Sequence, residues 1–136
     1  MQLELILENP GITISYDHDM QWQYVNWHGV HDIASSRQCC LLMLEAMRLR
    51  PSAKILNDNS NIIRTSVHLT EWSLQWLASM HEAGLHYLAW VYAAEFPERQ
   101  STEAIVKYMA RPTVASFDDV ATAYNWLLRQ HVSPRP

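Results

Sequence analysis

The apolar residues of this chain repeat with two different periods, and the order of those periods restricts the fold. In residues 2–8 three leucines alternate with Gln2, Glu4 and Glu8, with Ile6 breaking the polar side, and residues 12–17 alternate without a break. A two-residue period predicts half-buried β-strands. Between them, Pro10 and Gly11 predict a type II turn, in which the glycine takes a positive φ. Residues 22–27, rich in aromatic and β-branched side chains, predict a third antiparallel strand.

From residue 31 onward, helical spacings and short apolar runs alternate. Ile55 and Leu56 are apolar neighbours in one such run, as expected of a strand that helices cover on both faces. The predicted helices cover residues 31–50, 70–83, 101–110 and 116–130, and the predicted strands between them cover residues 53–58, 85–93 and 113–116. The first helix ends before Pro51, and the second is capped by Thr70 or Ser66 and ended by Gly84. The last helix starts at Ser116 and Asp119.

This order, βββαβαβαβα, predicts an α/β fold: a mixed β-sheet with an N-terminal antiparallel meander and a parallel part. The chain has 136 residues, so we expect a single domain over residues 1–136. The adjacent cysteines Cys39 and Cys40 lie inside a predicted helix, where a disulfide between them would be strained. We expect both thiols to be buried and free.

Charge and hydropathy exclude several partners. The net charge is -4, and no cluster of Lys and Arg is present, which argues against nucleic acid. The first residues carry Glu4 and Glu8 and do not resemble a signal peptide, and the longest apolar run, 88–94, is too short to span a membrane. We therefore expect a cytoplasmic protein. With 49% hydrophobic residues and six tryptophans, the chain has apolar surface to spare for a protein partner or a homodimer.

A polar run, Asn57 to Ser66, follows the predicted strand over 53–58 and is interpreted as a loop leading to the next helix. Open α/β sheets bind ligands beyond the carboxyl ends of their strands, and a helix N-terminus can hold an anion or a carboxylate. The run has one aspartate and no glycine, so it does not match a calcium loop. The predicted residues for binding a partner or ligand are Asp58, Asn59, Ser60, Arg64, Thr65 and Ser66.

Three stretches, "AKILNDNSNI", "WSLQWLASMHEAGLHYLAWV" and "SFDDVATAYNWLL", give the chain its resemblance to a known family. With the element order above, they resemble the SpoIIAA-like branch of the STAS-like proteins, the fold of anti-sigma-factor antagonists. The resemblance implies a binding role. Phosphorylated antagonists carry an Asp-Ser-Ser-Gly motif after the matching strand, whereas residues 64–67 here read Arg-Thr-Ser-Val. Whether Thr65 or Ser66 is phosphorylated stays open.

Residues that suggest catalysis or metal binding are sparse. His28, His31 and Asp32 form a short cluster, but a zinc site needs about four ligands, and His31 or Asp32 is expected to cap the helix instead. Trp72 and Trp76 share a helical face, a spacing more typical of a core than of a ligand cage. Exposure of another tryptophan would instead indicate an apolar patch or cavity; the residues concerned are Trp22, Trp27 and Trp90.

We therefore expect a regulatory or protein-interaction module that is not an enzyme and needs no cofactor. The alternative is a carrier of a small apolar ligand, such as a lipid or fatty acid, in a tryptophan-lined cavity. A third hypothesis is an enzyme whose site residues are dispersed along the chain.

Overall fold

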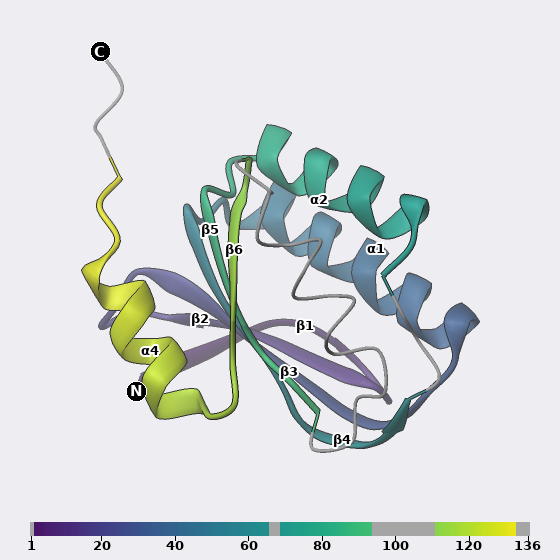
Figure 1. The fold of residues 1–136 in the computed structure, drawn as a ribbon. Helices are drawn as coiled ribbons and strands as arrows, with labels where there is room; N and C mark the ends of the chain where they lie inside the picture. The colour runs from purple at the N-terminus through teal and green to yellow at the C-terminus, as the bar shows by residue number, and fades with distance from the viewer. Residues whose placement is uncertain (1, 66–68, 94–110, 133–136) are drawn as a thin grey trace.

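A six-stranded sheet with helices on both faces makes up the part of the chain that the computed structural model describes, residues 2–65, 69–93 and 111–132 (Figure 1). Its elements are β1 (Leu3–Asn9), β2 (Ile12–Asp17), β3 (Trp22–His31), α1 (Ile33–Leu49), β4 (Lys54–Thr65), α2 (Glu71–Glu82), β5 (Tyr87–Val91), β6 (Thr113–Phe117) and α4 (Val120–Arg129). The helix expected over 101–110 lies outside the described residues.

The strands lie in the order β1-β2-β3-β4-β5-β6. The first three pair antiparallel, and the pairs β3 with β4, β4 with β5, and β5 with β6 are parallel. The predicted mixed sheet with an N-terminal antiparallel meander is confirmed. It follows from the sequence because short turns join antiparallel neighbours, whereas parallel neighbours need a crossover connection.

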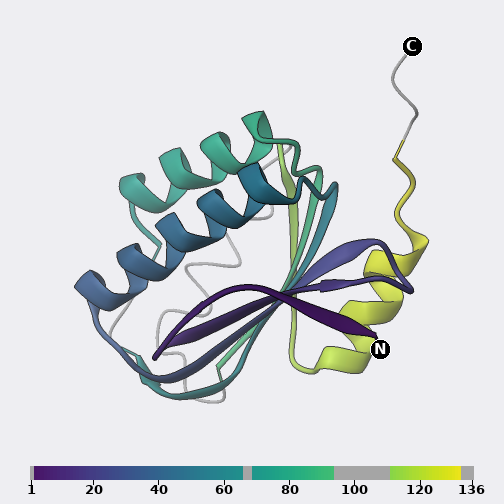
Figure 2. The ribbon, with the colours of Figure 1, turned by 180° about the vertical axis from the view of Figure 1, so that it is seen from behind.

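The helices divide between the two faces of the sheet. Helices α1 and α2 lie side by side over one face, and α4 covers the other, as both views show (Figures 1 and 2). The side chains of adjacent β4 residues pack on opposite faces of the sheet. Ile55 belongs to the apolar cluster under α1 and α2, and Leu56 belongs to the cluster under α4. Both side chains are fully buried, as expected for a strand covered on both sides.

Side-chain caps fix where the helices begin. Asp32 accepts a hydrogen bond from the backbone N–H of Ser35 at 2.8 Å at the start of α1. This bond lowers the pKa of the Asp32 carboxyl, because it favours the charged form. Thr70 caps α2, and the start expected for the last helix needs a correction: Asp119 is its cap, and Ser116 belongs to β6. Gly84 ends α2 with a positive φ of 121°, as predicted.

The turn between β1 and β2 differs from the prediction. Gly11 is not among the residues with positive φ, so the type II assignment is wrong. Position 11 requires glycine for a different reason, because the structure leaves no room there for a side chain. A Cβ atom on Gly11 would lie 2.7 Å from Cε1 of His31, and the ring of His31 is in hydrogen-bonding contact with the carbonyl oxygen of Gly11 at 3.1 Å.

Replacing Gly11 by alanine should therefore lower the free energy of unfolding by roughly 1–3 kcal/mol, the usual cost of overpacking a fitted site. Urea denaturation of Gly11→Ala, His31→Ala and the double variant measures the effect. The two substitutions should be less than additive, because the smaller side chain at position 31 removes the clash. Additive losses would show that the contact with His31 is not the cause.

None of the described helices is long and apolar enough to cross a membrane.

Candidate functional site

The polar run expected to be a loop is a strand. Strand β4 continues from Lys54 through the polar residues to Thr65. The reason is its neighbour: β3 runs on to His31, and its last residues pair in parallel with Asn61 to Thr65. Backbone hydrogen bonds to an adjacent strand override the low strand propensity of Asn and Ser. The loop assignment of Asn57 to Ser66 is thus wrong for every described residue of the run.

Two β-bulges decide which side chains of β4 face α1 and α2. The register with β3 shifts once between Asp58 and Asn61, and again between Ile62 and Arg64. Each bulge inserts one extra residue and so resets the two-residue alternation of the strand. The residues that face the α1 and α2 layer are consequently spaced by two and then by three positions; they are Asn57, Asn59, Ile62 and Thr65.

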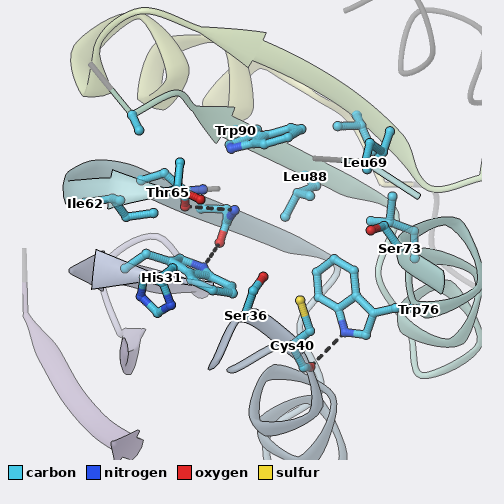
Figure 3. A pocket seen from close by; sticks show the side chains of 16 residues that line it. His31, Ser36, Cys40, Ile62, Thr65, Leu69, Ser73, Trp76, Leu88 and Trp90 are labelled. Carbon is cyan, nitrogen blue, oxygen red and sulfur yellow. Dashed lines mark hydrogen bonds between the residues drawn. The ribbon is translucent and has the colours of Figure 1, made fainter. Parts of the chain in front are cut away.

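These four residues form one wall of a pocket between the sheet and the two helices (Figure 3). The pocket encloses about 100 Å³. Most of the remaining lining is apolar or aromatic and comes from β3, α1, α2 and β5; it includes Trp27, Cys40, Trp76, Leu77, Leu88 and Trp90. The pocket therefore lies toward the carboxyl ends of the parallel strands, the end at which sheets of this kind place ligands.

Hydrogen bonds hold two of the indole rings in place. Nε1 of Trp27 donates to Oδ1 of Asn57 at 2.8 Å, and Nε1 of Trp76 donates to the carbonyl oxygen of Cys40 at 2.7 Å. Figure 3 shows the second bond at the edge of the pocket. Because each N–H is used within the protein, these two tryptophans offer the pocket their apolar surfaces.

The structure separates the residues predicted from the polar run. Asn59 and Thr65 line the pocket. Ser60 and Arg64 are exposed, and Ser66 lies outside the described residues. Asp58 is only 2% exposed and follows Leu56 on the α4 face of the sheet. Its side chain is therefore not accessible to a partner or ligand beyond the carboxyl end of the strand.

Asp58 has a structural role. Its carboxylate accepts a hydrogen bond from the Tyr24 hydroxyl at 2.7 Å and one from the backbone N–H of Ser60 at 2.9 Å, the latter within the first bulge. Burial raises the pKa of Tyr24 strongly, and the bond to Asp58 and its negative charge add to the shift. Asp58 thus stabilises the bulge that aims the next residues of β4.

Within the described residues, the histidine cluster does not form a metal site with its neighbours. The ring of His31 is 3% exposed, and its nitrogens contact Oγ of Ser35 and the carbonyl oxygens of Gly11 and His28. Among the described residues, no three of His, Cys, Asp and Glu lie close enough to hold a metal ion. Asp32 caps α1, as one of the two residues suggested for that role.

Both cysteines are free and buried, as predicted. Burial raises the pKa of the Cys40 thiol strongly, and the neighbouring Cys39 adds to the shift. Burial also raises the pKa of Cys39. A thiol held protonated is a poor nucleophile, so Cys40 contributes to the pocket as an apolar surface.

Sequence reasoning missed the tryptophans as a group. Trp76 was interpreted as core, and Trp27 and Trp90 were left to be decided by their exposure. The three come from different elements, α2, β3 and β5. Helical periodicity in one segment cannot show that two strands place indoles opposite the same helix face. The one available signal was the high tryptophan content of the chain, which suggested aromatic surface without a location.

Comparison with solved structures places the fold. An uncharacterised protein of the DUF3478 family with a SpoIIAA-like fold, from Shewanella loihica, matches with a TM-score of 0.56 and 18% identity over 90% of this chain and 98% of its own. An anti-sigma factor antagonist from Mycobacterium paratuberculosis matches with a TM-score of 0.54 and 17% identity over 89% and 98%. No protein-family model and no curated protein matches the sequence.

The chain therefore has the SpoIIAA-like, STAS-like fold that its sequence landmarks predict. At these identities the likeness defines the fold and leaves the function to be argued from the residues themselves.

Proposed function

We propose that this protein is a regulatory module that acts by binding another protein, without catalysis. Its fold is shared with an anti-sigma factor antagonist, a protein whose name describes a regulatory role. Fold alone does not define a function, so the proposal depends on the surface that this chain presents.

The observation that carries the proposal is an exposed apolar patch at the carboxyl ends of β3 and β4. Val30 is 59% exposed and Ile63 is 73% exposed. Val30 pairs in register with Arg64, and Ile63 is the extra residue of the second bulge beside them. We call these three residues, Val30, Ile63 and Arg64, the β3–β4 tip. Large apolar side chains next to an arginine are typical of the centre of a protein interface.

The chemistry of the pocket supports a role without catalysis. Of its lining residues, His31 and Cys40 are the titratable ones in the described part of the chain. The ring nitrogens of His31 are held by backbone and serine oxygens, and Cys40 is kept protonated by burial. These commitments argue against general acid–base catalysis by either side chain.

A charge-reversing variant of the tip tests the proposal. Affinity purification from the source cells identifies the partner, and titration calorimetry then measures its affinity. The double substitution Ile63→Asp with Arg64→Glu should weaken binding at least 10-fold, about 1.4 kcal/mol, because it removes apolar area and inverts the charge.

The chain offers a matched control on α4, where Leu128 is 51% exposed and is followed by the exposed Arg129. Leu128→Asp with Arg129→Glu makes the same chemical change away from the tip and should leave the affinity unchanged. Equal binding by the tip variant and the wild type would refute the β3–β4 tip as the contact surface.

A further inference from the structure

We propose that the pocket between the sheet and helices α1 and α2 is a binding site for one small, uncharged aromatic molecule, of the size of phenol or indole. This goes beyond the proposed partner binding and does not depend on it, because the pocket and the β3–β4 tip are formed by different side chains. The proposal depends on the volume of the pocket, its aromatic walls and the absence of charged side chains among the described residues that line it.

The volume sets the size of the ligand. At about 100 Å³, the pocket is close to the ~150 Å³ of an apolar cavity that holds a single benzene ring. Sites for drug-sized ligands are larger, roughly 300–1,000 Å³. The pocket thus fits one ring with few substituents better than the long acyl chain of a fatty acid.

The walls favour a flat, aromatic molecule. Trp27, Trp76 and Trp90 contribute to the lining from three different elements, and Leu88 lies between Trp76 and Trp90 in the view of Figure 3. The hydrogen bonds of Trp27 and Trp76 fix their rings before any ligand arrives. Aromatic rings in offset or edge-to-face contact attract each other beyond the gain from burying area.

The lining also indicates that the ligand carries no charge. No Lys, Arg, Asp or Glu is among the described residues that line the pocket. The ring of His31 is committed to the oxygens around it. A carboxylate or ammonium group placed here would lose its hydration without gaining a partner of opposite charge, which costs far more than an apolar contact returns.

Two polar groups can orient a ligand through one hydrogen bond. Asn57 is 6% exposed, and its Nδ2 group carries two hydrogens, of which a long contact of 3.5 Å to Oδ1 of Asn59 uses one. The Ser36 hydroxyl lines the pocket from α1 and has no hydrogen-bond partner in the described part of the chain. Figure 3 shows its side chain directed toward the space below Leu88 and Trp90. A ligand hydroxyl can accept from the Asn57 amide or donate to the Ser36 hydroxyl, whereas a ring N–H can donate to Ser36 alone.

Titration with phenol and indole, followed by calorimetry and by the quenching of tryptophan fluorescence, tests the site. At least one of the two should bind saturably at one site per chain and raise the melting temperature. Benzoate, similar in size but charged, and decanoate, with a long chain, should each bind at least 10-fold more weakly than the better of the two rings.

Ser36→Leu should reduce the affinity for that ring at least 10-fold, because leucine occupies the space in front of Ser36. Gln38→Leu adds the same side chain to α1 at an exposed position outside the pocket and should bind as the wild type does. If circular dichroism shows that Ser36→Leu does not fold, Asn59→Leu fills the pocket from β4 and takes its place.

Failure of both phenol and indole to bind the wild type would overturn the proposal. Undiminished binding by the folded pocket variant, or binding of benzoate or decanoate as tight as that of the ring, would overturn it as well. None of these measurements uses a protein partner, so their outcome is separate from that of the β3–β4 tip variants.

Discussion

Truncating Leu127 to alanine should lower the free energy of unfolding by about 2–5 kcal/mol, the range for emptying a leucine site in a packed core. Leu127 is fully buried in α4 and belongs to the apolar cluster that includes Trp22 and Leu56. That cluster fills the space between α4 and the sheet, so the site cannot collapse without moving the helix. Urea denaturation followed by circular dichroism gives the value.

The next residue provides the control. Leu128 is 51% exposed, and its truncation should change the free energy of unfolding by no more than about 0.5 kcal/mol. Two adjacent leucines with such different losses would show that α4 packs on the sheet through one face only. Similar losses for the two variants would contradict the position of α4 on the sheet.

Met43 to alanine should have an effect of similar size on the opposite face, about 2–5 kcal/mol. Met43 is fully buried in α1 and belongs to the cluster under α1 and α2, together with Ile14 and Met80. The expected loss measures how firmly the helical layer above the pocket is attached to the sheet. The same denaturation experiment applies.

Leu41, two residues earlier in α1 and 56% exposed, is the matched position. Alanine at this site should leave stability within about 0.5 kcal/mol of the wild type. If Met43→Ala were as mild as Leu41→Ala, α1 would not be packed on the sheet as described, and the account of the pocket, which α1 helps to enclose, would fail with it.

The order of the elements could be predicted because local patterns and tertiary packing agree in most of the chain. Asp32 and Thr70 were each one of two caps that side-chain chemistry suggested, and Gly84 marks a helix end, so local signals placed these boundaries to within a few residues. The paired apolar residues Ile55 and Leu56 likewise show that both faces of β4 are covered. Fold class follows from such signals because each is contained within a few residues.

Features created by distant contacts could not be predicted in the same way. The polar residues after Asp58 become a strand only because β3 extends beside them, and neither strand indicates its length by its own pattern. Gly11 was assigned to backbone conformation, whereas its requirement comes from the ring of His31, 20 residues away. In both cases the deciding interaction joins segments that are separate in the sequence.

The sequence selected some of the residues that line the pocket, and their role in binding stays a prediction. The reasoning that ligands bind beyond the carboxyl ends of parallel strands selected Asn59 and Thr65, which are part of the lining. It also selected Asp58, which the alternation along the strand sends to the other face, and it did not select Trp27 or Trp90. The type of each polar residue could be read from the sequence, and so could its chemistry. The face of the sheet on which its side chain lies depends on the two bulges of β4, which no local sequence signal indicates.

Each bulge of β4 holds one residue more than regular pairing with β3 requires. Removing one residue between Asp58 and Ile62 would therefore remove the first bulge and leave Ile62 opposite Gly29, still facing the tryptophans. The same deletion in a part of β4 without a bulge would turn the following side chains over to the other face. In homologous chains, single-residue deletions in β4 should accordingly be concentrated at its two bulges.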